Sequence, residues 1–469
     1  MVSEAAPGCI AYNRILHFSL LSPMKLNDVH GTYAGRRNTL VAGMAIAGGG
    51  IALIPTAREA ARNRDSLYPF RHDSYFYYLT GFIEPESVLV LIAGPTPNTA
   101  PKSILFCREK NLEREIWDGY RYGPEGAREA FGFDEARPIG ELAAALPQLL
   151  ADQPAVYTFV GLDPAWDKTI TDALNGVRAL VRTGVSAPSV VHDARALLDA
   201  QRLIKDPHEI ATMRRAGEIS SLAHTQAMRH ARPGQYEYEV EAELLHEFIR
   251  HGAREQAYSA IVASGPNACV LHYRENHRRM ADGDLLLIDA GCEYASYASD
   301  ITRTFPVNGR FTGPQKALYE LVLEAQLRCI DAVKPGAPFN AYHDTAIKVL
   351  AQGLIDLGLC QGTLDAVLES KAYFQFYMHR AGHWLGLDVH DAGDYRRGGS
   401  NGEWQALRPG MVLTVEPGLY IRPADNVPEQ FHNIGVRIED DILITATGNE
   451  NLTVKTPKSV ADVEAACRR

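Results

Sequence analysis

Short apolar runs, separated by stretches with helical periodicity, fill the first two hundred residues of the chain. Buried strands are predicted where these runs are apolar almost throughout, at residues 49–55, 87–93, 103–107 and 156–160. Helices are predicted further along, at residues 127–131, 139–150 and 166–181. Strands interleaved with helices indicate an α/β domain that runs to about residue 200.

Aromatic side chains are concentrated in residues 68–82, YPFRHDSYFYYLTGF, with polar residues between them. We interpret this stretch as aromatic core and subunit packing rather than as a ligand site. Trp117 lies among polar residues in segment 113–120, which makes it a candidate contact residue. A half-buried packing role for Trp117 fits the sequence equally well, so both interpretations stay open.

A domain junction is predicted at residues 195–206. Asp206 and Pro207 then begin a helix, with Glu209 in its first turn. Further helices are predicted at residues 236–251, 315–334 and 340–357, and strands at residues 259–264, 411–415 and 433–439. A pair of helices followed by strands that carry acids occurs twice. We therefore expect a second domain made of two similar halves.

The stretch 284–306, DLLLIDAGCEYASYASDITRTFP, poses a charge problem. Residues 285–288 predict a buried strand, and this strand ends in Asp289. Gly291 is expected to turn the chain, and residues 296–305 predict a returning strand. A carboxylate at the end of a buried strand needs a cation or hydrogen bonds to stay ionised. The balancing groups should therefore be found elsewhere in the chain.

More acids follow the same pattern. Asp300, Thr302 and Thr304 alternate with apolar or basic residues, so they are expected on one face of the returning strand. The apolar run 411–415 ends in Glu416, as the first run ends in an aspartate. The second half of the chain thus mirrors the first.

The remaining candidates lie between and after these strands. Arg437, Glu439 and Asp441 are predicted to share one face of the last strand pair. The segment MHRAGHWLGLDVHDAG adds the histidines His379, His383 and His390. Each acid or histidine taken alone is more often a turn, cap or structural residue, so the case for a site rests on the group.

Four carboxylates cannot converge without cations, which favours a metal centre. An oxygen-rich set with one imidazole suits Mn²⁺ or a similar divalent ion. The acids also exceed what one ion needs, so we expect two ions about 3.5–4 Å apart, joined by bridging carboxylates. The residues alone leave this metal site and a purely structural role about equally supported.

Composition narrows the class of protein. A chain of 469 residues is too long for one ordinary core, so two domains are expected. The net charge of -10, without a basic block, argues against a nucleic-acid partner. No apolar run is long enough for a membrane span. The scattered cysteines form no CxxC pair, which is typical of reduced thiols in a cytoplasmic protein.

Several segments resemble the "pita-bread" metallopeptidases, most closely the aminopeptidase P family. They are YPFRHDSYFYYLTGF, LHY at 271–273, IDAGCEYASYASDITRTFPVNG, HWLGLDVHD, LTVEPGLYI and NIGVRIEDDILIT. The resemblance covers about residues 30–455. It implies an α/β N-terminal domain at 29–203 plus an α+β two-halved "pita-bread" catalytic domain at 204–455. Residues 1–28 are expected to be a disordered tail, and 456–469 a C-terminal tail.

The resemblance also implies roles for individual residues. The metal ligands would be Asp289, Asp300, His383, Glu416 and Glu439, with Asp300 and Glu439 as the bridging carboxylates. Residues that line the site or act in catalysis would be His272, His379, His390, Arg437 and Glu416. Trp117 would be lent to a neighbouring subunit's site, which implies a homotetramer or homodimer. Tyr258 would contact substrate.

The implied activity is removal of the N-terminal residue from peptides with proline in second position, by a hydroxide that bridges two metal ions, with Mn²⁺ as the expected metal. The main alternative is a prolidase that acts on Xaa-Pro dipeptides. A non-catalytic binding module is disfavoured because all five ligand types are present. The sequence departs from the family in its N-terminal tail, and also at Arg380, Ala381 and Gly382, where the wider family often has Gly after the first histidine.

Overall fold

The computed structural model describes residues 26–94 and 101–468. The chain divides into two compact units, Met1–Ala194 and Arg195–Arg469. Most of the predicted N-terminal tail, residues 1–25, lies outside the described residues. The predicted domain bounds at 203 and 455 stay predictions. No helix in the described part of the chain is long and apolar enough to cross a membrane.

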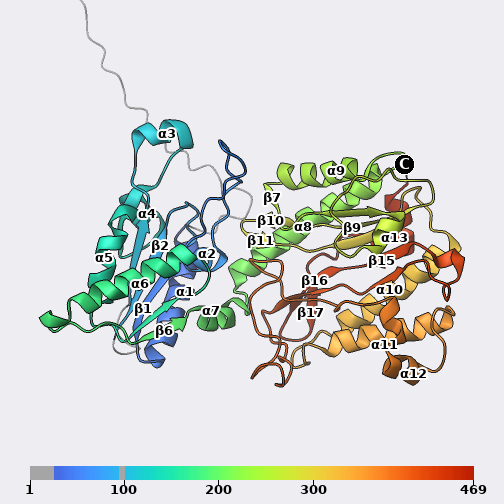
Figure 1. Ribbon diagram of the computed structural model, residues 1–469. Helices are drawn as coiled ribbons and strands as arrows, with labels where there is room; N and C mark the ends of the chain where they lie inside the picture. The colour runs from blue at the N-terminus through green and yellow to red at the C-terminus, as the bar shows by residue number, and fades with distance from the viewer. Residues whose placement is uncertain (1–25, 95–100, 469) are drawn as a thin grey trace, which may run out of the picture. The chain divides into compact units, whose positions relative to one another are not determined.

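A six-stranded mixed sheet forms the centre of the first unit, in the order β4-β3-β2-β1-β5-β6 (Figure 1). Its strands are β1 (Gly50–Pro55), β2 (Val88–Ala93), β3 (Lys102–Cys107), β4 (Glu135–Pro138), β5 (Ala155–Thr158) and β6 (Val190–Asp193). The central strands are buried along almost their whole length, which is why they are apolar runs in the sequence. Edge strand β6 is mostly exposed and lacks such a run, so the sequence did not predict it.

Helices complete the first unit. They are α1 (Leu26–Ile46), α2 (Ser74–Thr80), α3 (Leu112–Asp118), α4 (Gly123–Phe131), α5 (Leu142–Leu150) and α6 (Pro164–Ala179). Apolar side chains of α5 and α6 share one core cluster with those of β1, β2 and β3. The predicted helices at 127–131, 139–150 and 166–181 are confirmed, with a 3-10 turn at the start of the second.

The aromatic stretch 68–82 contains helix α2, which Asp73 caps by accepting a hydrogen bond from the backbone N–H of Phe76. Most of its aromatic rings are buried, so the predicted core role is confirmed. Trp117 is different. It lies on α3, which has no buried side chain, and it is 82% exposed. A half-buried packing role for Trp117 is therefore wrong for this chain.

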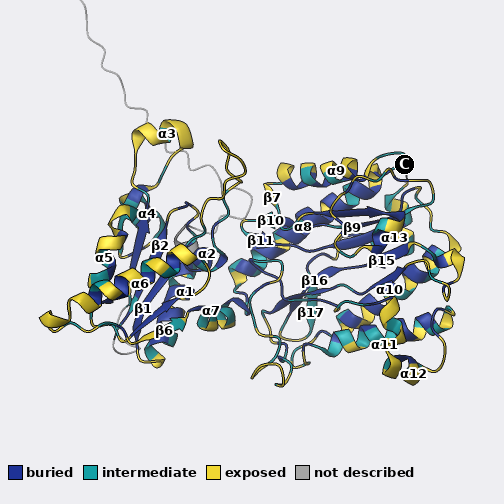
Figure 2. Cartoon of the chain, in the orientation of Figure 1, coloured by how far each residue is buried: buried dark blue, intermediate teal, exposed yellow. Residues whose placement is uncertain are grey.

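The second unit has the predicted two-halved arrangement. Its helices are α7 (Arg195–Arg202), α8 (Pro207–His230), α9 (Glu237–Arg250), α10 (Gly313–Ala332), α11 (Ala341–Asp356), α12 (Leu364–Ser370) and α13 (Val460–Ala466). The pair α8 and α9 precedes a sheet of order β12-β9-β8, and the pair α10 and α11 precedes a sheet of order β13-β16-β17. One continuous core cluster joins residues of both halves, and Figure 2 shows the buried strands between half-exposed helices.

The strands of this unit are short. They are β7 (Glu255–Gln256), β8 (Ile261–Ser264), β9 (Leu285–Asp289), β10 (Cys292–Tyr294), β11 (Tyr297–Ala298), β12 (Thr302–Pro306), β13 (Val412–Val415), β14 (Gly418–Ile421), β15 (Ile434–Arg437), β16 (Asp440–Ile444) and β17 (Asn449–Asn451). Strand β15 lies against β9 and β12. This contact brings together the strand ends next to which Asp289, Asp300 and Glu439 lie.

The predicted turn at Gly291 is wrong. The chain turns at Ala295 and Ser296, which both have positive φ and connect the paired strands β10 and β11. A Cβ atom at Gly291 would lie 1.6 Å from the carbonyl oxygen of Ser299, so glycine is needed there for close approach of the two chain segments. The returning strand predicted at 296–305 is accordingly divided into β11 and β12.

The last predicted strand, 433–439, is found as β15 but is shorter at its C-terminal end. Strand β15 ends at Arg437, and β16 begins at Asp440. Asp441, in β16, pairs with Thr414 of β13. The carboxylate of Asp441 accepts the backbone N–H of Asp300 at 3.2 Å. Asp441 therefore supports the chain at Asp300 through a backbone contact rather than extending the polar face of β15.

Candidate metal centre

Three side chains from distant parts of the sequence converge in the second unit. One ligand atom each from Asp300, His383 and Glu439 lies within 4.8 Å of the others. Asp300 precedes β12, Glu439 follows β15, and His383 lies in the segment before β13. The structure thus brings together three of the predicted ligands from both halves.

Asp289 joins this group through two neighbours. Its Oδ1 accepts a hydrogen bond from the Tyr258 hydroxyl at 2.6 Å, and the same hydroxyl contacts Asp300. Its Oδ2 accepts from Arg437 Nη2 at 2.7 Å. Thr302 pairs with Asp289 across β9 and β12, so the register of this hairpin places the two aspartates near one another.

Glu416 approaches the cluster from the end of β13. Its Oε1 lies 3.9 Å from Nε2 of His383, and this nitrogen is 3.4 Å from Oδ2 of Asp300. His383 Nδ1 is 2.9 Å from the backbone oxygen of Trp384. Because a carbonyl only accepts, Nδ1 carries hydrogen and Nε2 faces the carboxylates. This is the orientation that a metal-binding histidine needs.

The positive charges near these carboxylates are too few to balance all of them in the ionised form. Burial, followed by the repulsion of neighbouring acids, raises the pKa of Glu439 well above its ordinary value. Burial likewise raises the pKa of Glu416, to about 7, despite the opposing effects of His383 and Arg437. For Asp289, burial again outweighs the guanidinium of Arg437 and raises the pKa. Carboxyl groups with raised pKa values in one cluster indicate a site built for added cations.

Asp300 and His383 behave as a pair. Burial alone would raise the pKa of Asp300, but the hydrogen bond and charge of His383 lower it. Burial alone would lower the pKa of His383, but the hydrogen bond and charge of Asp300 raise it to about 9. The proton on His383 thus supplies positive charge where the donor set could hold a metal ion. Carboxylate oxygens with one imidazole fit a hard divalent cation.

The other predicted histidines surround this group. His379 Nε2 is 2.9 Å from the Tyr420 hydroxyl, and its Nδ1 is 2.7 Å from the backbone oxygen of Arg380. Burial lowers the pKa of His379 to about 3, so the ring is neutral. The ring of His390 lies 4.1 Å from that of His383, measured between centroids. Burial, and then the charge of His383, lowers the pKa of His390. His272 is exposed.

Sequence reasoning missed two polar residues that connect the site. Thr302 Oγ1 donates to Glu439 Oε2 at 2.6 Å and accepts from Arg437 Nε at 3.1 Å. The Tyr420 hydroxyl accepts from Arg437 Nη1 at 2.8 Å and so links the guanidinium to His379. The alternation around Asp300 placed Thr302 on the right face, but no sequence signal assigned it a partner.

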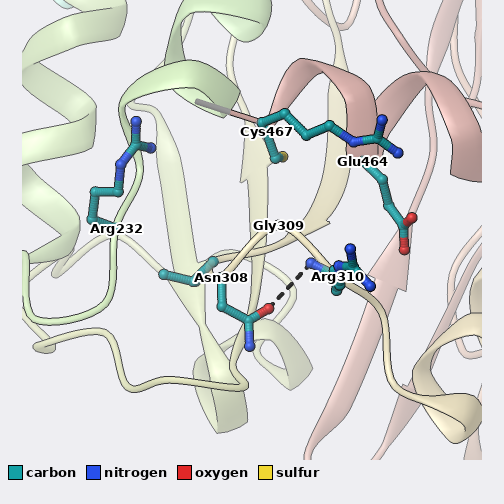
Figure 3. Close-up of a pocket in the computed structure, with 8 residues that line it drawn as sticks. Arg232, Asn308, Gly309, Arg310, Glu464 and Cys467 are labelled. Carbon is teal, nitrogen blue, oxygen red and sulfur yellow. Dashed lines mark hydrogen bonds between the residues drawn. The ribbon is translucent and has the colours of Figure 1, made fainter.

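A separate surface cavity of about 250 Å³ lies near the end of the chain, where Arg232, Arg310, Glu464 and Cys467 line it (Figure 3). None of the predicted site residues lines this cavity. Trp117 belongs to the first unit, on α3. The chemistry therefore centres on the carboxylate cluster of the second unit.

Comparisons with known proteins agree with this geometry. The model of "Metallopeptidase family M24" matches residues 211–446, and that of "Aminopeptidase P, N-terminal domain" matches residues 33–157. A Xaa-Pro aminopeptidase of Escherichia coli (strain K12) is 48% identical, across 92% of this chain and 96% of its own. Xaa-Pro aminopeptidase 3 of Rattus norvegicus is 37% identical, across 87% and 78%. The solved structure of Pseudomonas aeruginosa aminopeptidase PepP matches with a TM-score of 0.90 and 49% identity, covering 93% of this chain and 98% of that one.

Proposed function

Since the chain belongs to metallopeptidase family M24 and carries an aminopeptidase P N-terminal domain, we propose that it is a Xaa-Pro aminopeptidase whose reaction takes place at the carboxylate cluster. The predicted architecture, an α/β domain followed by a two-halved "pita-bread" domain, is confirmed by the same matches. The enzyme removes the N-terminal residue from peptides that have proline in second position. The observation that carries the proposal is the convergence of Asp300, His383 and Glu439 from both halves of the second unit.

Divalent metal binding follows from the family. We assign the ligands as Asp289, Asp300, His383, Glu416 and Glu439, and propose two ions, with Mn²⁺ as the physiological metal. When bound, such ions polarise the scissile carbonyl and lower the pKa of water. Asp300 and Glu439 belong to the compact cluster and are suited to contact both ions.

Glu416 is the proposed proton carrier. In the metal-free protein, burial raises the pKa of Glu416 to about 7, so this carboxyl group exchanges a proton near neutral pH before metal binds. It would accept the proton of the attacking water and donate it to the proline nitrogen. This second transfer matters because the amide nitrogen of proline carries no hydrogen and must be protonated before it leaves.

The remaining residues orient these groups. Arg437 holds Asp289, Thr302 and Tyr420 with different nitrogens of one guanidinium, which fixes the ligand carboxylate. His390, whose ring lies beside that of His383, would donate a hydrogen bond to the developing oxyanion. We assign contacts along the substrate to His272 and His379.

Peptide substrates of different length test the activity. We expect Xaa-Pro-Pro tripeptides to be cleaved when Mn²⁺ is added to chelator-treated enzyme, and not before its addition. The Asp300→Ala variant should lose both activity and bound metal. Cleavage of Gly-Pro with no cleavage of any tripeptide would instead identify a prolidase, which the names of the relatives do not favour.

The exposed face of α3 supports a proposal about assembly. Trp117 and Tyr120 are 82% and 93% exposed, which is unusual for large aromatic residues on a free surface. We propose that the enzyme is a homodimer or homotetramer in which Trp117 reaches a neighbouring subunit's site. The described cysteines are free thiols. On that ground we assign the enzyme to the reducing cytoplasm.

A further inference from the structure

Arg303 is a completely buried arginine that lies directly behind the metal-binding residues. It follows Thr302 on β12, so its side chain points away from the face that carries Thr302. Its Nη1 donates to the backbone oxygens of Thr302 at 2.9 Å and Glu439 at 2.5 Å. One nitrogen thus holds a residue of the first half and a proposed metal ligand of the second half.

The other nitrogens of Arg303 bind the C-terminal segment of the chain. Nη2 donates to Asp440 Oδ1 at 2.6 Å and to the Thr456 backbone oxygen at 3.2 Å. Nε donates to the backbone oxygen of Pro457 at 3.0 Å. Residues 456 and 457 lie beyond 446, where the match to the family model ends.

Asp440, like Arg303, is held by several hydrogen bonds. Its carboxylate also accepts hydrogen bonds from the side chains of Gln326, Asn451, Thr453 and Lys458. Arg303 and Lys458 both form ion pairs with this carboxylate, at 2.6 Å and 2.7 Å. The carboxylate therefore keeps the guanidinium in one orientation.

This arrangement joins the two strand ends that face the metal centre. Thr302 and Glu439 contact each other through their side chains, at 2.6 Å, and through the backbone, where Glu439 N–H donates to the Thr302 oxygen at 3.1 Å. Arg303 binds the carbonyl groups of both residues from behind. The separation between Asp300 and Glu439 is therefore set by Arg303, which is outside the proposed ligand set.

We propose that Arg303 and Asp440 are positioning residues that fix Glu439 against the Asp300 strand and so set the metal affinity of the site. This inference rests on the proposed metal-dependent function. General stability is a poor reason to bury such a pair, because apolar residues of similar volume often stabilise a core equally well. Mutation of a residue that orients a metal ligand from outside the coordination sphere typically weakens metal affinity about 10–100-fold.

Metal titration of matched lysine variants tests the proposal. Arg303→Lys keeps the charge but cannot make the same set of bonds, so calorimetric titration of the chelator-treated protein with Mn²⁺ should show roughly tenfold or greater weakening. Arg278→Lys is the matched control. Arg278 binds Asp284 and Ser264 at the end of β9 remote from Asp289, so its variant should bind Mn²⁺ within twofold of the unsubstituted protein.

Circular dichroism before titration establishes that each variant is folded. If Arg303→Lys is unfolded, Asp440→Asn carries the test, with an expected weakening of severalfold or more. Excess Mn²⁺ should restore much of the activity of a folded variant, which a general loss of structure would not allow. Unchanged Mn²⁺ affinity in a folded variant overturns the positioning role. Failure of the unsubstituted protein to bind Mn²⁺ overturns instead the proposed function on which the inference rests.

Discussion

Asp289 and Arg437 come from different halves of the catalytic unit, and Nη2 of the arginine donates to Oδ2 of the aspartate at 2.7 Å. Asp289 ends β9, whereas Arg437 ends β15. The same guanidinium reaches Tyr420, whose hydroxyl contacts His379. The Arg437 guanidinium thus connects Asp289, a proposed metal ligand, to His379 through Tyr420.

Replacing Arg437 with lysine should therefore impair catalysis more than charge conservation suggests. A lysine ammonium cannot hold Asp289, Thr302 and Tyr420 together in the planar geometry of the guanidinium. We expect kcat for a Xaa-Pro-Pro peptide to fall by roughly 10–100-fold at saturating Mn²⁺. Arg422→Lys is the control, since Arg422 binds only the backbone oxygen of Cys269 among the described residues. Equal kcat values for the two variants would contradict this role.

The sequence predicted the positions of two acids because each stands at the end of a recognisable apolar run. Asp289 is the last residue of β9, and Glu416 directly follows β13. The turn at Ala295 and Ser296 was missed because neither residue carries the Asn-Gly type of signal that such turns usually show. The turn was predicted at Gly291 instead, although glycine is needed there for the close approach of the Ser299 backbone.

Residues that act through long-range contacts could not be predicted. The pattern predicts only that Arg303 belongs to a strand, whereas its partners Glu439 and Asp440 lie more than a hundred residues away. Periodicity tells which face of a strand a side chain occupies, but not which later segment will pack there. Sequence patterns therefore predicted candidate ligands of the site but not the groups that hold them.

Tyr258→Phe should destabilise the metal-free protein more than the metal-loaded protein. The hydroxyl lies within hydrogen-bond distance of both Asp289 and Asp300 and has one hydrogen to share between them, so its loss removes a donor from buried carboxylates when metal is absent. We expect a loss of about 1–3 kcal/mol in free energy of unfolding without metal, and a smaller loss with Mn²⁺ bound. Urea unfolding with chelator and with Mn²⁺ measures both values.

Tyr342→Phe provides the control for that comparison. The Tyr342 hydroxyl is buried and has no hydrogen-bond partner among the described residues, so its removal should not lower stability, with or without Mn²⁺. An equal loss for Tyr258→Phe with and without Mn²⁺ would mean that the hydroxyl does not substitute for metal at the carboxylates.

Trp117→Ala should weaken assembly and activity without weakening the fold. Because Trp117 is 82% exposed, its truncation removes no core packing within the chain. In the full-length variant we expect a smaller oligomeric fraction in sedimentation velocity and a lower kcat/KM. The Tm of the first unit, measured in the same full-length protein, should be unchanged. Val181→Ala, which alters another exposed apolar side chain of the same unit, should change none of these values. Unchanged oligomer and kcat/KM in Trp117→Ala would remove Trp117 from the proposed interface.

The metal-free protein should lose stability as pH rises from 6.5 to 9. The pKa of His383 is raised to about 9 in the folded protein, compared with about 6.5 when unfolded. Its stabilising contribution is therefore complete below pH 6.5 and disappears as pH passes through 9, a change of about 3 kcal/mol at most. Glu416, with a pKa of about 7, adds a change of the same sign at the lower end of this window. Urea unfolding in the presence of chelator, at half-unit pH steps, measures the slope.

His383→Gln isolates the responsible group. The variant cannot gain or lose the proton at that position, so the difference in unfolding free energy between unsubstituted and variant protein should itself change across pH 6.5–9. Saturating Mn²⁺ should abolish or reverse the slope of the unsubstituted protein, because metal binding displaces the proton from the histidine. Parallel pH profiles for the two metal-free proteins would show that His383 is not charged by Asp300.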